Sequence, residues 1–101
     1  MTETQSISWI FLAIALASQT EAADFNSIST IADGINHAVP THKEMQTSIL
    51  FLTTKDLVRK QGKKYDLTAK GKNTYQLAND NSKTLLQIWK NLGDLIENYT
   101  S

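Results

Sequence analysis

The chain has 101 residues, of which 41% are hydrophobic and 20% charged, and this composition suits one small globular domain. It contains no cysteine, which excludes disulfides, zinc–thiolate sites and thiol nucleophiles. The net charge of zero hides an uneven distribution. Residues 1–42 carry four acidic residues and no Lys or Arg, whereas residues 55–72 carry seven basic residues and two acidic ones. This asymmetry predicts a basic patch on one side of a neutral protein.

The first apolar segment runs from Ile7 to Ala17 and is interrupted only by Ser8. A signal peptide needs a positively charged stretch before its apolar segment, and the first Lys or Arg of this chain is Lys43. The segment is also too short to span a bilayer. We therefore expect a helix from about Ser6 to Gln19, central to the core or shared with a second chain, in a cytoplasmic protein without a membrane partner.

A second helix is predicted by apolar residues at helical spacing. The spacing continues past Gly34, so this glycine is expected inside the helix, although it costs about 1 kcal/mol of helix stability relative to Ala. Pro40 disfavours helical geometry at Val39, which predicts a short connection over residues 37–40. Residues 20–25 are expected to form a loop before the helix. The apolar face consists of Ile28, Ile31, Ala32, Ile35 and Ala38. The candidate N-caps are Asp24, Asn26 and Ser27.

The third helix, residues 41–54, has the clearest start signal in the sequence. Thr41 and Glu44 stand at the spacing of a capping box, in which each side chain satisfies a backbone N–H of the other residue. Helical spacing divides the remaining side chains into two faces. The predicted inward face is Met45, Ser48, Ile49 and Leu52, and the outward face is Lys43, Gln46, Thr47, Leu50 and Thr54.

Residues 57–67 predict a β-hairpin, because two short alternating segments flank the glycine-containing turn Gln61–Lys63. Leu57, and Tyr65 and Leu67 with it, are expected to face the core, while the lysines face water. Thr68 is then the N-cap of a fourth helix from Ala69 to Ala78.

The last helix is expected to run to about Tyr99, after an interruption at residues 80–82. Its apolar residues form one stripe from Leu85 to Tyr99. These elements predict a mainly α fold with a small β-hairpin. Residues 1–79 form the domain, and residues 80–101 form a C-terminal amphipathic helix that packs on the domain or pairs two copies.

The order of these elements resembles the winged helix-turn-helix regulators, including the MarR-type and PadR-type families. The likeness rests on residues 41–78: Leu52-x4-Leu57-Val58 is similar to a recognition helix entering the first wing strand, and Tyr65-x-Leu67-Thr68-x2-Gly71 to the second strand entering the next helix. Residues 32–41 are similar to small bacterial winged-helix proteins. Related proteins usually have Gly where Asp56 stands.

The resemblance implies a transcriptional regulator that binds double-stranded DNA. A helix presented beyond a short turn fits the major groove, so residues 41–54 would supply the groove contacts. The basic wing, residues 57–67, would contact phosphate. The expected DNA-binding residues are Lys43, Gln46 and Thr47 on the helix, and Arg59, Lys60, Lys63 and Lys64 on the wing.

The alternative is a winged-helix module that binds another protein and no DNA, since a fold does not fix a function. Leu50 and Phe51 stand where DNA-binding members are commonly polar. If both pack beneath the chain's own helices, the groove face stays polar, whereas exposure favours a protein partner.

An enzyme is not expected, and neither is a cofactor or a metal. His37 and His42 are five positions apart with Pro40 between them, which is not the spacing of two ligands on one helix face. No nucleophile elbow and no phosphate-binding glycine loop occurs in the sequence.

A homodimer through the terminal helices is the expected assembly. The first helix is apolar on more than one face, and the last helix adds an apolar stripe. This is more apolar surface than one small core requires, so the remainder is expected to be buried against another surface. A second copy is the simplest one, because twofold pairs are the commonest soluble oligomers. The open alternative is that the last helix folds back on the first within one chain.

Overall fold

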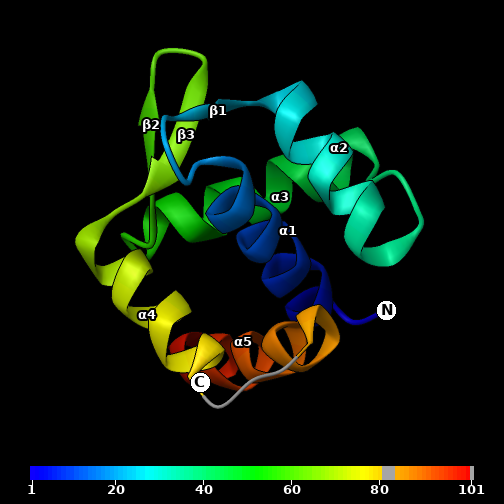
Figure 1. Ribbon diagram of the computed structural model, residues 1–101, viewed down its shortest axis with the longest axis vertical. Coiled ribbons are helices and arrows are strands. Elements are labelled where there is room, and N and C mark those ends of the chain that lie inside the picture. Colours follow the sequence, from blue (N-terminus) through cyan, green and yellow to red (C-terminus); the bar gives the residue numbers. More distant parts are fainter. Residues whose placement is uncertain (81–83, 101) are drawn as a thin grey trace.

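The computed structural model describes residues 1–80 and 84–100, and in this part the protein is mainly helical with a small antiparallel sheet, as the sequence predicts (Figure 1). The elements in chain order are α1 (Glu3–Ala17), β1 (Ala23–Asp24), α2 (Phe25–Asn36), α3 (His42–Thr54), β2 (Val58–Gln61), β3 (Lys64–Leu67), α4 (Ala69–Asn79) and α5 (Leu85–Thr100).

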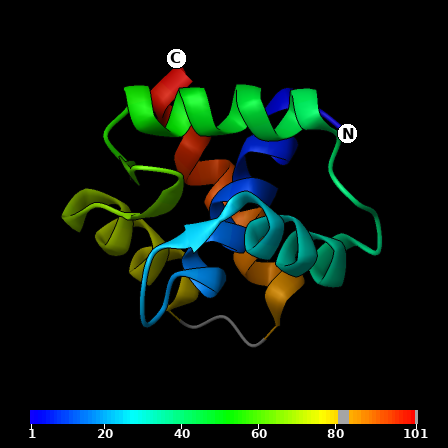
Figure 2. The ribbon, with the colours of Figure 1, turned by 90° about the horizontal axis from the view of Figure 1, so that it is seen from above.

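Helix α1 is the centre of the core. Every residue from Ile7 to Ala15 is buried, because α2, α3, α5 and β3 all pack around the helix (Figures 1 and 2). The expectation of a central core helix is confirmed. The helix begins earlier than the expected Ser6, because Thr2 and Gln5 form a capping box. Their spacing is the same as that of Thr41 and Glu44, so the signal was present in the sequence and was missed. No helix among the described residues is long and apolar enough to cross a membrane.

Helix α5 lies along α1 and covers it. The indole ring of Trp89 stacks on that of Trp9 with centroids 6.2 Å apart, and its N–H donates to the Gln5 carbonyl at 2.9 Å. The buried residues of α5 are Ile88, Leu92 and Ile96. The two apolar stripes are therefore buried against each other within one chain. The apolar surplus that suggested a homodimer is reduced accordingly, and the dimer itself stays a prediction that light scattering tests.

The prediction of a loop over residues 20–25 is wrong at its C-terminal end, because residues 23–24 form β1 and Phe25 begins α2. Ala23 pairs with Tyr65 and Asp24 with Lys64, which adds a third strand in the order β1-β3-β2. A two-residue strand is too short for an alternating pattern to be recognised. Of the three candidate N-caps, Asp24 is the one used, and its carboxylate accepts the Ser27 N–H at 2.8 Å.

The hairpin and its connections follow the sequence closely. Val58, Tyr65 and Leu67 are buried, and the turn between the strands has Gly62 in the left-handed region at φ 63°. Thr68 is the N-cap of α4, as predicted. Asp56 also has a positive φ of 61°, which explains why glycine suits this position. Asp80 is the C-cap of α4, and the rest of the expected interruption, residues 81 and 82, lies outside the described residues.

Gly71 is required where α4 meets the start of the hairpin. A β-carbon at this position would stand closer than 3.0 Å to the Leu57 carbonyl oxygen and 3.3 Å from the Leu67 Cβ. The carbonyl cannot simply move away, because it accepts the Thr68 backbone N–H at 3.2 Å. The glycine of the Leu67-Thr68-x2-Gly71 pattern thus fixes α4 against the base of the hairpin.

Candidate nucleic-acid interface

Helix α3 begins at the capping box that the sequence predicts. The Thr41 hydroxyl accepts the Glu44 backbone N–H at 3.0 Å, and the Glu44 carboxylate accepts the Thr41 N–H at 2.8 Å. The inward face is also confirmed, since all four of its residues are buried: Met45, Ser48, Ile49 and Leu52. The helix is therefore held by one face against α1 and β2, and its other face is left to solvent.

The outward face of α3 consists of exposed residues, as expected: Lys43, Gln46, Thr47, Leu50 and Thr54. At about 100° per residue, these five lie within an arc of about 100° around the helix axis. Leu50 falls near the middle of this arc, and 67% of it is exposed. Any partner that covers the arc must therefore touch Leu50.

Phe51 behaves differently from Leu50. It is half-buried and packs against the core. The Lys55 ammonium group lies 5.9 Å from its ring centroid, which partly covers the remaining surface. The sequence leaves the burial of these two residues open, and the structure separates them. Leu50 is exposed, whereas Phe51 is half-buried against the core.

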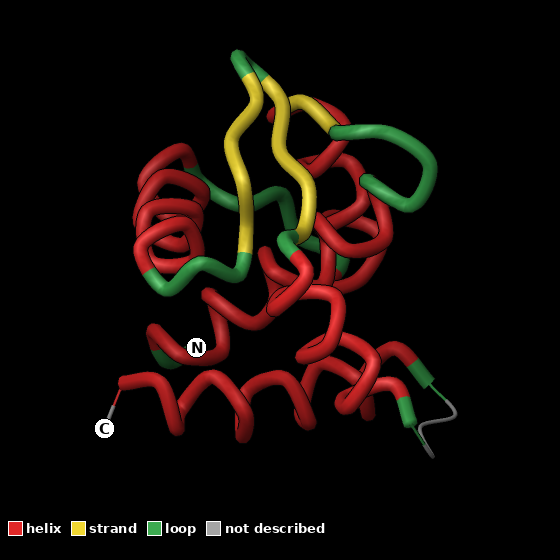
Figure 3. The backbone as a smooth tube through the Cα atoms, turned by 90° about the vertical axis from the view of Figure 1, so that its left-hand side faces the viewer, coloured by secondary structure: helices red, strands yellow, loops and turns green. Residues whose placement is uncertain are grey.

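The hairpin stands beside α3, and its turn projects away from the helices (Figure 3). Lys60, Lys63 and Lys64 are exposed at this projecting end. Within residues 1–80 and 84–100, the side chains of Lys60 and Lys63 make no hydrogen bond or ion pair, so their charges are open to an external anion. Lys64 lies close enough to Asp24 to help lower the pKa of that carboxyl, although the main cause is the hydrogen bond from the Ser27 backbone N–H.

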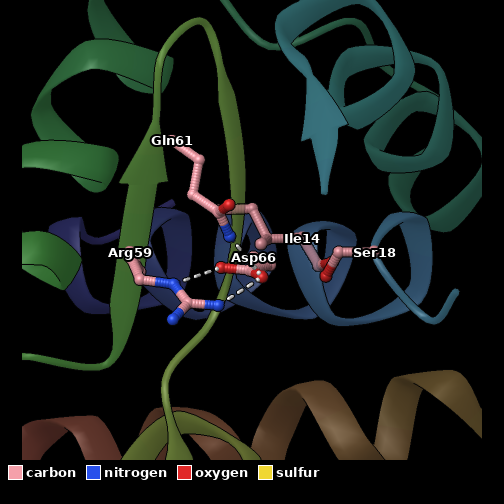
Figure 4. A network of polar contacts seen from close by, with 5 residues as sticks. All are labelled: Ile14, Ser18, Arg59, Gln61 and Asp66. Atoms are coloured by element: carbon pink, nitrogen blue, oxygen red, sulfur yellow. Dashed lines mark hydrogen bonds and ion pairs between the residues drawn. The ribbon is translucent and has the colours of Figure 1, made fainter. Parts of the chain in front are cut away.

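Arg59 is not a free cation, unlike Lys60 and Lys63. Its guanidinium group donates two hydrogen bonds to the Asp66 carboxylate, from Nε at 3.2 Å and from Nη2 at 3.0 Å, and Gln61 donates a third at 2.9 Å (Figure 4). These hydrogen bonds, that from Arg59 above all, hold the pKa of Asp66 below its usual range, and the pKa of Arg59 is raised in turn.

The pairing of Arg59 with Asp66 was not predicted, although the sequence contains a signal for it. Arg59 and Asp66 are equidistant from the Gly62–Lys63 turn, so a hairpin with a two-residue turn places them directly opposite each other. Opposite charges in this relation predict a cross-strand ion pair. The expected contact of Arg59 with phosphate stays a prediction, and its side chain is 60% exposed although it is paired with Asp66.

Acidic residues surround the N-terminal end of α3. Glu3 of α1 and Glu44 line the same small depression as Lys43 and Thr47. Charged side chains of both signs therefore lie at this end of α3, whereas the projecting hairpin presents three exposed lysines.

Neither histidine belongs to a metal cluster. The described residues contain no group of three or more His, Asp or Glu side chains that could hold a metal ion. His37 is the left-handed C-cap of α2 at φ 55°, and the ring of His42 lies 5.9 Å from that of Phe25, centroid to centroid. Both residues have structural positions at helix ends.

Comparison with known proteins adds no relative to this description. No protein-family model, no curated protein and no solved structure matches the chain.

Proposed function

We propose that the chain is a winged-helix protein that binds double-stranded DNA, with α3 as the recognition helix and the β2–β3 hairpin as the wing. The order helix, strand, helix, helix, hairpin and the sheet order β1-β3-β2 support the winged-helix assignment. The observation that carries the function is an exposed, largely polar helix face beside a projecting hairpin with three exposed lysines.

The dimensions suit such a complex. An α-helix with its side chains is about 10–12 Å across, and the major groove of B-DNA is about 12 Å wide. Gln46 is suited to adenine, whose N6 and N7 edge it can bind with two hydrogen bonds. Lys60, Lys63 and Lys64 would contact phosphates, whose neutralisation releases counterions and supplies affinity without sequence preference.

Arg59 has a different role in this proposal from the one its charge suggests. Its hydrogen bonds to Asp66 tie β2 to β3, so it stiffens the wing instead of meeting phosphate directly. Asp66→Asn would release the guanidinium group and is expected to strengthen DNA binding slightly and to steepen its salt dependence.

The test is fluorescence anisotropy with labelled mixed-sequence duplexes at about 50 mM salt, the low end of the usual range. The double variant Lys63→Glu with Lys64→Glu should bind all duplexes more weakly and reduce the salt slope by about two. Lys90→Glu removes an exposed lysine of α5 and is the matched control, which should bind as the unmodified protein does. Undetectable binding by the unmodified protein would contradict the proposal.

The second candidate function is a protein-interaction module, and the exposed Leu50 favours it. This leucine places apolar surface in the middle of the outward arc of α3, where a protein partner could cover it. Phe51, packed on the core, does not add to this apolar surface. The isolation of Leu50 among polar neighbours is the reason that we rank DNA binding first.

A further inference from the structure

We infer that α3 recognises thymine in the major groove, with Leu50 contacting the C5-methyl group of the base. The inference rests on the proposed DNA-binding function and goes further, because it names the bases and the residue that selects them. It gives the one apolar residue of the outward face a role in sequence specificity.

The position of Leu50 is the first step. It lies near the middle of the outward arc, one helical turn from Gln46 and about the same distance from Thr54. Its exposed fraction of 67% makes it the one large apolar side chain of that arc. A groove that accepts α3 by this arc must therefore place a base edge against an aliphatic side chain.

The chemistry of the groove is the second step. The major-groove edges of guanine, cytosine and adenine present hydrogen-bond donors and acceptors, and thymine alone adds a methyl group. A leucine pressed against any of the polar edges would remove water from a donor or acceptor and offer no partner, which is unfavourable. Against the thymine methyl, the same leucine buries apolar surface on both sides.

The neighbours of Leu50 point to the same base pairs. Gln46 lies about 6 Å away along the helix axis, less than two base-pair steps of about 3.4 Å, so both side chains would meet pairs no more than two steps apart. Glutamine is suited to adenine, and the methyl group of Thr47 can also contact thymine. The arc has no arginine, the residue that most often binds guanine, and its single cation, Lys43, lies beside Glu3 and Glu44.

The isolation of Leu50 favours a base over a protein partner. The other exposed large hydrophobic residues of the described chain lie outside α3: Met1, Val39, Leu77, Leu85 and Leu86. A protein interface generally centres on several clustered apolar or aromatic residues. One leucine ringed by lysine, glutamine and threonine side chains suits a contact of the size of one methyl group.

The experiment removes the methyl groups from the DNA. A duplex is first enriched from a random pool by repeated binding and amplification, and is then synthesised twice, once with thymine and once with deoxyuridine at every thymine position. Deoxyuridine lacks the C5-methyl group and keeps the hydrogen-bonding edge. The unmodified protein should bind the thymine duplex more tightly, by about fourfold for each methyl group that Leu50 covers.

Protein variants assign the effect to Leu50. Leu50→Ala, and Leu50→Asn as a second variant of similar shape, should show a clearly smaller preference for the thymine duplex, because only the contact from Thr47 remains. Leu77→Ala removes an exposed leucine of α4 and should keep the preference for thymine. Melting followed by circular dichroism verifies that each variant is folded.

The contrary outcomes are distinct. Failure to bind any duplex would overturn the DNA-binding function and this inference with it, and would leave Leu50 to a protein partner. Binding without enrichment of any sequence, or equal affinity of the unmodified protein for both duplexes, would overturn the inference alone. A thymine preference that is undiminished in both Leu50 variants would overturn the assignment to this residue.

Discussion

Helices α1 and α3 begin in the same way and end up in opposite surroundings. They have 15 and 13 residues, and each starts with a capping box. Residues 7–15 of α1 are buried on every side, whereas α3 buries one face and exposes the other. A helix that is apolar all round must be buried, and here its own chain encloses it, so its sequence serves packing. The outward face of α3 is not needed for packing, so its chemistry is the place to look for function.

The largest expected effect tests the enclosure of α1. Phe11 is fully buried, and Phe11→Ala should reduce the free energy of unfolding by about 3–5 kcal/mol, because it opens a cavity in the centre of the core. Phe51→Ala on α3 is the matched control, and its half-buried ring should cost clearly less. Urea unfolding gives both values. Equal losses would mean that the contrast between the two helices is overstated.

The next test compares the two faces of α3. Leu52 and Met45 are buried, so replacing either with Ala should cost about 2–5 kcal/mol of unfolding free energy. Leu50→Ala should change it by less than about 0.5 kcal/mol, because the side chain is exposed. Small losses at all three positions would show that the inward face of the helix has been assigned wrongly.

The support of the hairpin beside α3 depends on Gly71. Gly71→Ala should reduce the free energy of unfolding by about 1–3 kcal/mol, because the new methyl group overlaps the Leu57 carbonyl. Gly34→Ala is the matched control in an open part of α2, and should raise stability by up to about 1 kcal/mol. Thermal unfolding of both variants measures the difference, and a neutral Gly71→Ala would show that α4 can shift away from the hairpin.

The capping boxes should behave alike in the two helices. Thr2→Ala and Thr41→Ala each remove the acceptor of one backbone N–H and should each cost about 1 kcal/mol. Thr2→Ser and Thr41→Ser keep the hydroxyl and are the controls. A much larger loss at Thr2 would indicate that the start of α1 also holds α5 in place, through the Gln5 carbonyl that Trp89 binds.

The smallest effect concerns acid. The pKa of Asp66 is lowered mainly by the hydrogen bonds from Arg59, so the pair stabilises the folded protein above the ordinary Asp value of 3.8. This contribution is lost as the pH falls through the lowered pKa in the folded state. Asp66→Asn should therefore lose part of its stability deficit, relative to the unmodified protein, below about pH 4. Unfolding by urea at pH 7 and pH 3 measures this change, and an unchanged deficit would contradict it.

Much of the fold followed from local patterns. The apolar run of α1, the Thr41–Glu44 capping box, the two faces of α3 and the hairpin strands all depend on residues near one another in the chain, and the structure has them as predicted. The beginnings of α1 and α2 and the short strand β1 were missed. Strand β1 in particular is defined by its pairing with β3, some 40 positions later, and not by its own two residues.

The candidate site divides in the same way. Helical periodicity by itself determined that Lys43, Gln46, Thr47 and Leu50 share one face, because 3.6 residues per turn fixes their relation whatever surrounds them. Only the tertiary structure decided which of Leu50 and Phe51 is exposed, since neighbouring positions on a helix point about 100° apart and the core covers one of them. The pairing of Arg59 with Asp66 also required the folded hairpin, because it depends on register across two strands. Burial and pairing arise between segments, and a one-dimensional pattern does not contain the distances that decide them.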